Sequence, residues 1–256
     1  MKKIMEPLNL FPGMKNYWFF YGNDGPAQFV LTYGSVKSRL KMNGHSAKFP
    51  NYAVLLWGYH PKIGKRVLIE TSNKLSFPPK GQLTVSFDEK GYKINHNEMK
   101  INFGKKYSKT KPVNIGKVVN FVNEYRYFKG KMFGEKIKGK GYLQKVTVGV
   151  PFISWDWVRF HGNSLGELFK VKFMPRTIFK LNGKKYPVRL TARDGKLHIL
   201  SDKVDITSEP YANHVMAFSG LGEFKYTEYF VKFTGEVEGK KILDYGIVEK
   251  ARGFVF

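Results

Sequence analysis

Apolar and polar residues alternate with a period of two along most of this chain, in short runs bounded by Gly, Asn or Pro. Successive side chains of a strand point to opposite faces of its sheet, so this alternation predicts β-strands rather than helices. The predicted strands are Gln28–Tyr33, Tyr52–Tyr59, Arg66–Thr71, Gln82–Asp88, Glu98–Phe103, Tyr142–Val148, Ile153–Phe160, Glu167–Met174, Arg176–Leu181, Tyr186–Leu190, Lys196–Leu200, Phe224–Glu236 and Ile242–Lys250.

Turn residues divide these runs into hairpins. Asn182-Gly183, Asp194-Gly195 and Glu238-Gly239 each stand between two predicted strands, and such pairs favour tight β-turns. One segment, 115–125, has apolar residues at helical spacing and weakly predicts a helix, since its β-branched content opposes one. The fold class predicted from the pattern is therefore all-β with little helix.

A faint internal repeat suggests two related halves. The segment from Gly134 to Lys145 resembles the segment from Gly235 to Lys250, about 105 residues later, and both read as strand, glycine turn, strand. Chance similarity between two Lys-Gly hairpins is the alternative. A true duplication predicts an N-terminal domain over 1–150 and a C-terminal domain over 151–256. Closing each sheet into a barrel would hide the strand edges.

Composition limits the class of protein. Hydrophobic residues make up 42% of the chain, which excludes wholesale disorder, and the absence of Cys excludes disulfides and thiolate metal sites. The longest uncharged apolar run, Tyr52–Trp57, is far too short to span a membrane. The first residues contain no apolar core of a signal peptide. We therefore expect a soluble, cytoplasmic protein.

The formal net charge of +24 has two interpretations. Only eight of the 44 basic residues are Arg, and a Lys-rich, Cys-free chain fits the solvated surface of a thermophile protein. Alternatively, the charge attracts an anionic membrane surface or nucleic acid, since Lys105–Lys111 and Tyr125–Tyr142 interleave aromatic residues with Lys. We adopt the solvated surface, and expect nucleic-acid binding to be weak and blind to sequence.

The segment 152–161 holds the strongest candidate chemistry. As a strand it places Ile153, Trp155, Trp157, Arg159 and His161 on one face, and Phe152, Ser154, Asp156, Val158 and Phe160 on the other. Asp156 would then lie among apolar side chains, where desolvation raises the pKa of a carboxyl and prepares it as a general acid. A buried Asp that only satisfies neighbouring hydrogen-bond donors is the alternative.

Other motifs carry less. Gly162-Asn163-Ser164-Leu165-Gly166 matches a nucleophile elbow, but a strand rather than a helix follows it, so we expect a hairpin turn. The six His show no paired ligand spacing. The sequence thus predicts neither a metal nor a cofactor.

Several of these segments resemble a known family. Trp155-Asp156-Trp157, the glycine turn at 162–166 and the strand from Glu167 are similar to motifs of the two-domain lipocalin-like family that includes carotenoid 1,2-hydratase (hydroxyneurosporene synthase). Tyr17–Gly22 followed by Phe29–Gly34 is similar to the first strand pair of that family. The resemblance implies two calycin-type antiparallel barrels, an apolar cavity, and acid-assisted hydration or cyclisation of isoprenoid-like ligands.

One departure leaves catalysis open. The hydratases have an acidic cluster before the Trp-Asp-Trp strand, where this chain has Gly141–Val146, and neither an amide nor an ammonium replaces a carboxylic acid as the donor to an alkene. We expect a lipophilic small molecule in a barrel cavity, hydrated, cyclised or isomerised if Asp156 is the proton donor. A lipid carrier and a nucleic-acid-binding barrel are the alternatives. The expected ligand-binding residues are Trp155, Trp157, Tyr142, Gln144, His161, Trp18 and Trp57.

Overall fold

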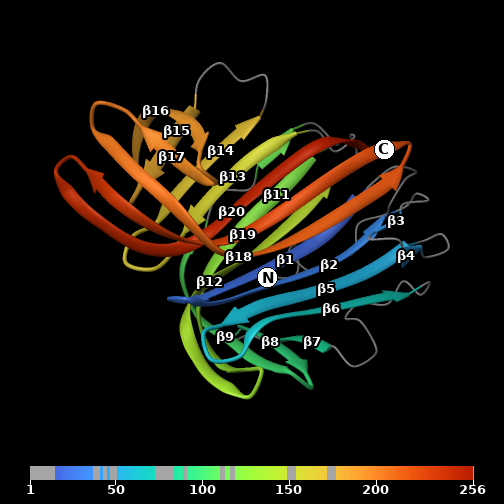
Figure 1. The fold of residues 1–256 in the computed structure, drawn as a ribbon. Coiled ribbons are helices and arrows are strands. Elements are labelled where there is room, and N and C mark those ends of the chain that lie inside the picture. The colour runs from blue at the N-terminus through green and yellow to red at the C-terminus, as the bar shows by residue number, and fades with distance from the viewer. Residues whose placement is uncertain are drawn as a thin grey trace. The chain divides into compact units, whose positions relative to one another are not determined.

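The computed structural model describes residues 15–36, 41–42, 45–46, 51–72, 84–88, 91–109, 113–115, 119–148, 154–171 and 177–255. The described part of the chain consists of strands and turns without a helix (Figure 1), and so it holds no helix that could cross a membrane. The chain divides into two units, Met1–Pro151 with Ser219–Leu221 and Phe256, and Phe152–Phe218 with Gly222–Val255.

The N-terminal unit contains a curled antiparallel sheet in the order β6-β5-β2-β1-β12-β11-β9-β8-β7, with β10 paired to β11. Its strands are β1 (Lys15–Asp24), β2 (Ala27–Val36), β5 (Asn51–His60), β6 (Gly64–Ser72), β7 (Thr84–Asp88), β8 (Gly91–His96), β9 (Met99–Lys109), β10 (Val113–Ile115), β11 (Val119–Met132) and β12 (Glu135–Val148). Two short strands, β3 (Lys41–Met42) and β4 (His45–Ser46), form a hairpin.

The second unit is a closed eight-stranded barrel. Its order is β17-β16-β15-β14-β13-β20-β19-β18, and β17 pairs with β18 to complete the ring. Its strands are β13 (Trp155–Phe160), β14 (Gly166–Val171), β15 (Thr177–Leu181), β16 (Lys184–Arg193), β17 (Lys196–Leu200), β18 (Val204–Gly220), β19 (Gly222–Val237) and β20 (Lys240–Val255). Closure of this kind removes the unpaired edges of the sheet.

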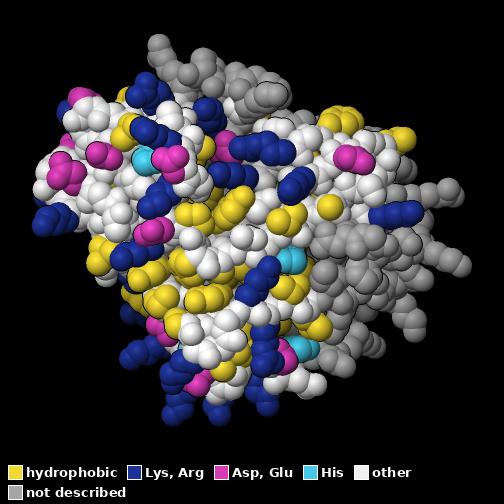
Figure 2. Space-filling model, in the orientation of Figure 1, with side chains coloured by type: hydrophobic (Ala, Val, Ile, Leu, Met, Phe, Trp, Pro, Cys, Tyr) yellow, Lys and Arg dark blue, Asp and Glu magenta, His cyan; other side chains and the backbone are white. Residues whose placement is uncertain are grey.

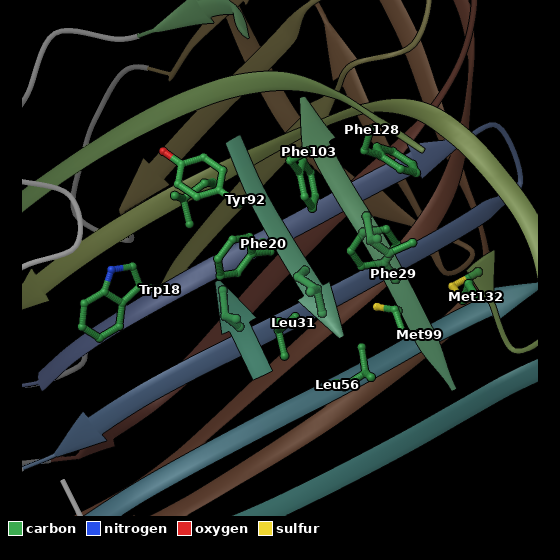
Figure 3. Packing of buried hydrophobic residues seen from close by; sticks show 14 of the residues in the cluster. Trp18, Phe20, Phe29, Leu31, Leu56, Tyr92, Met99, Phe103, Phe128 and Met132 are labelled. Atoms are coloured by element: carbon green, nitrogen blue, oxygen red, sulfur yellow. The ribbon is translucent and has the colours of Figure 1, made fainter. Parts of the chain in front are cut away.

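Each unit has its own apolar core. The curled sheet of the first unit wraps a cluster rich in aromatic side chains, in which Phe29 meets Phe103 and Phe128 at ring-centroid distances of 6.1 and 5.5 Å (Figure 3). The barrel encloses a second cluster around Phe160, Phe179 and Phe233. Eight strands leave an interior that side chains can fill, and here a packed cluster occupies it.

The predicted turns are confirmed. Asn182-Gly183, Asp194-Gly195 and Glu238-Gly239 all have positive φ at both residues, as tight β-hairpins with a right-handed twist require. Residues 161–165 form an irregular turn between β13 and β14, as expected for the Gly162–Gly166 motif. The helix predicted over 115–125 is wrong, because Ile115 ends β10 and β11 runs from Val119 onward.

The internal repeat corresponds to a shared hairpin, with one correction. The turn of the N-terminal copy lies at Phe133-Gly134, so Gly134 aligns with Gly239 and not with Gly235. Phe133-Gly134 matches Glu238-Gly239, and Gly141 matches Gly246, a separation of 105 residues in both cases. Gly141 faces β1, where a Cβ would lie 2.1 Å from the Tyr21 oxygen; Gly246 faces β13, where it would lie 2.1 Å from the Arg159 oxygen.

Candidate functional site

The strand β13 alternates as the sequence predicts. Val158 and Phe160 point into the barrel core, while Trp155, Trp157 and Arg159 lie on the opposite, outward surface of the barrel wall. The neighbouring strands add Glu249 on β20, and Tyr226 and Glu228 on β19. We call the six outward side chains Trp155, Trp157, Arg159, Tyr226, Glu228 and Glu249 the β13 face.

Strand register explains how this group assembles. Trp157, Glu249 and Glu228 are successive cross-strand partners in one row, and Trp155, Ala251 and Tyr226 are partners in the next row. Cross-strand partners on one surface lie about 5 Å apart, so the two carboxyl side chains are direct neighbours. The β13 face thus combines residues almost 100 positions apart in sequence that only the register brings together.

Glu249 is the centre of a buried polar network. The Arg159 guanidinium donates to one carboxylate oxygen and the Tyr226 hydroxyl donates to the other. Arg159 and Glu249 are only 1% and 3% exposed, and Glu228 is fully buried. Such charges are stable in a protein interior only when they are paired and hydrogen-bonded, as Glu249 is.

Aromatic rings surround this network. The Arg159 guanidinium carbon lies 3.9 Å from the centre of the Trp157 ring, a close cation–π contact. Trp155 packs against Tyr226 and Phe224, with ring-centroid distances of 5.8 and 5.4 Å. A few convergent polar groups within a mainly aromatic surface are typical of small-molecule binding sites.

Asp156 lies on the other side of β13, among charged rather than apolar neighbours. Its Oδ1 lies 2.5 Å from Nη2 of Arg252, and its side chain is 19% exposed. Lys250 is the cross-strand partner of Asp156. Burial lowers the pKa of the Lys250 ammonium; the charge of Arg252 lowers it too, and the charge of Asp156 raises it. The apolar environment expected for Asp156 is therefore replaced by an ion pair.

The other sequence candidates occupy three different places. His161 follows β13 and is 1% exposed. Tyr142 and Gln144 are buried on the surface of β12 that faces away from the N-terminal core, and Trp57 is buried on the corresponding surface of β5. Trp18 belongs to the core itself, with the Lys145 ammonium 5.0 Å from the centre of its ring. The structure brings together Trp155 and Trp157, but not all seven residues.

Sequence reasoning missed Glu249, Tyr226 and Glu228. A signal for Glu249 was present, because the 105-residue repeat aligns it with Gln144, a predicted site residue. The same offset aligns Glu228 with Asn123, and the structure pairs Asn123 with Gln144 as it pairs Glu228 with Glu249. The N-terminal unit therefore has two amides, Asn123 and Gln144, at the positions where the barrel has two carboxyls, Glu228 and Glu249.

A second buried charge cluster lies inside the curled sheet. Oε2 of Glu124 accepts from the Tyr92 hydroxyl and lies 3.2 Å from Nε of Arg126, while Nζ of Lys106 lies 3.5 Å from Oε1. Nη1 of Arg126 also donates to the Gly104 oxygen at 2.5 Å. Burial opposes ionisation of Glu124, but the Tyr92 hydrogen bond and the charges of Arg126 and Lys106 outweigh it and lower its pKa. Burial and Glu124 together raise the pKa of Tyr92.

Neither cluster resembles a metal centre. Among the side chains that the structure describes, no three His, Asp or Glu gather closely enough to hold a metal ion. The Glu249 carboxylate is instead engaged with Arg159 and Tyr226, and that of Glu124 with Arg126 and Lys106.

Comparisons with known proteins agree on the fold. The sequence matches no protein-family model and no curated protein. Solved structures do match: an AttH candidate from Nitrosomonas europaea (TM-score 0.52, 11% identity, 93% of this chain and 92% of that one) and kievitone hydratase from Nectria haematococca (0.52, 15%, 94% and 89%). A third is CghA in complex with Sch210972 (0.53, 11%, 95% and 88%).

This chain has the two-domain lipocalin-like fold. The resemblance noted from the Trp-Asp-Trp strand is thereby confirmed at the level of the fold, and the all-β prediction with it. A hydratase and a protein solved with a bound small molecule share this fold. At sequence identities of 11–15%, the similarity is evidence for the architecture alone.

Proposed function

We propose that this protein binds a lipophilic, isoprenoid-like small molecule against the β13 face and adds a proton to one of its double bonds. The observation that carries the proposal is the buried network of Arg159, Glu249 and Tyr226, bordered by the indoles of Trp155 and Trp157. An apolar cluster occupies the barrel interior, so we place the ligand on the other side of the barrel wall, at the partly exposed indoles of Trp155 and Trp157 that border the buried network.

The two carboxyls of the β13 face have different tasks in this proposal. Glu249 accepts hydrogen bonds from the Arg159 guanidinium and the Tyr226 hydroxyl. Glu228 is its cross-strand neighbour and is fully buried, and two adjacent buried carboxyls disfavour a second negative charge. We therefore assign the transferable proton to Glu228, as in other sites where two carboxyls divide acid and anion between them.

The chemical step is acid-assisted hydration. The Glu228 carboxyl gives its proton to one carbon of the alkene, and the electron pair of the double bond forms the new C–H bond. The cation left on the other carbon is stabilised by the faces of Trp155 and Trp157. Water then adds to that carbon and returns a proton to Glu228. Attack by a second double bond of the ligand in place of water gives cyclisation, and loss of a neighbouring proton gives isomerisation.

The first test measures ligand binding. Nile red is neutral and lipophilic, and its fluorescence rises when it leaves water. We expect Trp157→Ala to weaken binding about tenfold or more, since a buried aromatic contact is lost. The control is Leu243→Ala, which removes an exposed apolar side chain of the same unit. Equal affinities for the two variants would exclude the β13 face as the binding surface.

The second test measures turnover. Farnesol is incubated with the protein in ¹⁸O-labelled water, and the hydrated product is detected by mass spectrometry. We expect Glu228→Gln to lower the rate by about 10²-fold or more with Nile red binding kept within a few-fold. Asp156→Asn is the matched control, because it removes a carboxyl from the opposite side of β13. If Asp156→Asn loses activity and Glu228→Gln does not, Asp156 is the proton donor. Ligand binding without turnover would make the protein a carrier.

A further inference from the structure

Lysine side chains line a hollow on the outer surface of the N-terminal sheet. Strands β8, β9, β11 and β12 contribute Lys93, Lys100, Lys129, Lys131, Lys136 and Lys138, which we call the lysine face. The hollow has a volume of about 1030 Å³, and its lysines are exposed. Lys and Arg side chains gather along the lower edge of the view in Figure 2, where Figure 1 places these strands.

The register arranges this surface in rows. One row runs Asn95, Lys100, Lys131 and Lys136 across the four strands, and the next runs Lys93, Asn102, Lys129 and Lys138. Neighbouring strands are about 4.8 Å apart, and rows two residues apart are separated by about 6.8 Å. The ammonium groups therefore form a two-dimensional positive array rather than scattered surface charges.

Lysines face lysines directly in this array. Lys131 is the cross-strand partner of both Lys100 and Lys136, and Lys129 is the partner of Lys138. Like charges directly opposite destabilise a sheet, and a surface shaped only for solubility mixes charges of both signs. Within these two rows no carboxylate stands opposite a lysine. Asp24 lies at the rim, where its Oδ2 accepts from the backbone nitrogen of Lys138 at 2.9 Å.

Aromatic rings adjoin the array on the same surface. Tyr127 precedes Lys129 by two residues on β11, so both side chains point outward, and Tyr127 is 45% exposed. Tyr107 from β9 packs against Tyr127 with ring centroids 5.0 Å apart. Lys140 is the cross-strand partner of Tyr127. The two segments that interleave aromatic residues with Lys, Lys105–Lys111 and Tyr125–Tyr142, thus contribute to one surface.

We infer that the lysine face and Tyr127 together bind single-stranded nucleic acid without reading its sequence. A positive groove for the phosphates beside an aromatic ring on which bases stack is how such strands are held. The lysines suit this task because an ammonium acts on a phosphate as a point charge, whereas sequence readout favours the planar fork of Arg. An anionic membrane would favour large exposed apolar side chains beside the cations. The isoleucines of this hollow (Ile94, Ile101 and Ile137) are buried, and the exposed ring beside it is that of Tyr127.

The decisive experiment is a titration of fluorescein-labelled oligothymidylate or oligouridylate, about 15 nucleotides long, with the full chain, followed by fluorescence anisotropy. The logarithm of the affinity should fall linearly with the logarithm of salt concentration, by about 0.7 for each lysine that contacts a phosphate. We expect the double variant Lys129→Gln/Lys131→Gln to bind about tenfold more weakly at low salt and to lower this slope by about 1 to 1.5.

Two comparisons make the result specific. Lys240→Gln/Lys241→Gln removes the same charge from exposed positions of β20, and should leave affinity within about twofold. Tyr127→Ala should weaken binding about tenfold while Tyr127→Phe retains it, because the ring and not the hydroxyl stacks. Equal losses in the two lysine variants, or binding to phosphatidylserine vesicles but not to the oligonucleotide, would overturn the inference.

A thermal melt of each variant tests whether the variant is folded. Replacing Lys129 and Lys131 removes like-charge contacts, so the variant should melt at the same temperature as the wild type or higher. A lower melting temperature would show that the lysines stabilise the sheet, and would contradict their assignment to a ligand. The test is independent of the proposed function, because the β13 face belongs to the other unit.

Discussion

Replacing Glu124 by Gln removes the only acidic member of the charge cluster inside the N-terminal sheet. Arg126 would keep the Gly104 oxygen as a partner but lose its carboxylate, and its side chain is only 8% exposed. Removing one partner of a buried ion pair usually destabilises by about 3–5 kcal/mol. We expect about 3 kcal/mol here, because the Gln amide oxygen can still accept from Tyr92 and because Lys106 is half exposed.

A loss of this size is easily measured. For a unit of this length it corresponds to a fall in melting temperature of about 6–12 °C. The four Trp are divided equally, Trp18 and Trp57 in the first unit and Trp155 and Trp157 in the second. In a background with Trp155→Phe and Trp157→Phe, fluorescence during guanidinium denaturation reports the N-terminal unit alone.

The matched control is Glu135→Gln, the same change in the same unit. Glu135 pairs with Lys62 at 3.3 Å on the surface, where the Lys side chain is 71% exposed, so its loss should be below about 1 kcal/mol. Adding Arg126→Met to Glu124→Gln should restore at least half of the lost stability, since no unpaired buried cation remains. If Glu124→Gln costs no more than Glu135→Gln, the buried pair does not stabilise the sheet and the reasoning is wrong.

The pH dependence of the same variant has a definite sign. The folded state lowers the pKa of Glu124 below its ordinary value of 4.5, so its ionised form is favoured by folding. Its contribution is complete above pH 4.5 and is lost as the pH falls through the lower, folded-state pKa. The stability difference between wild type and Glu124→Gln should therefore stay constant near neutrality and shrink in acid.

Two further predictions concern the backbone. Gly141→Ala and Gly246→Ala should each destabilise by about 3 kcal/mol in denaturant titrations, because a Cβ would lie 2.1 Å from a backbone oxygen of the adjacent strand. Gly134 lies in open space but has a φ of 87°, so Gly134→Ala should destabilise by only about 1–2 kcal/mol. Asp244→Ala should speed amide exchange at Ser164 about 10- to 100-fold, because Oδ2 of Asp244 accepts from that nitrogen at 2.8 Å; unchanged exchange would show that the turn at 161–165 holds without it.

The sequence predicts local features of this fold well. Turn chemistry locates three hairpins at the correct residues, and alternation assigns each β13 side chain to its side of the strand. Both depend only on neighbouring residues, since a turn residue must tolerate positive φ and a strand reverses its side chains at every step.

The failure at 115–125 has a physical cause. Of the apolar positions that suggested one helical surface, Ile115 ends β10 and Val122 and Tyr125 lie on β11, while Val118 lies outside the described residues. Residues 122–125 of β11 are buried on both sides of the strand, because Val122 and Glu124 face the core while Asn123 and Tyr125 lie buried behind it. A strand covered on both sides shows no alternation between apolar and polar residues, and its period is lost.

The candidate site lies beyond prediction from one sequence for a different reason. Glu249 is the cross-strand partner of Trp157, and Glu228 is the next partner of Glu249, so their meeting depends on strand order and register across the barrel. The same non-local pairing explains Asp156, whose Arg252 partner could not be inferred from its apolar neighbours along the strand. Sequence periodicity identifies the side of a strand, but not the residues on the strands beside it.

The matched hairpins of the two units have a consequence for the ancestry of the chain. A hairpin repeated after 105 residues, with the same turn and the same glycine at a close strand contact, is the pattern expected if one half arose from the other by duplication and fusion of a gene. Under that origin each half can change without changing its counterpart. One half carries Asn123 and Gln144 where the other carries Glu228 and Glu249.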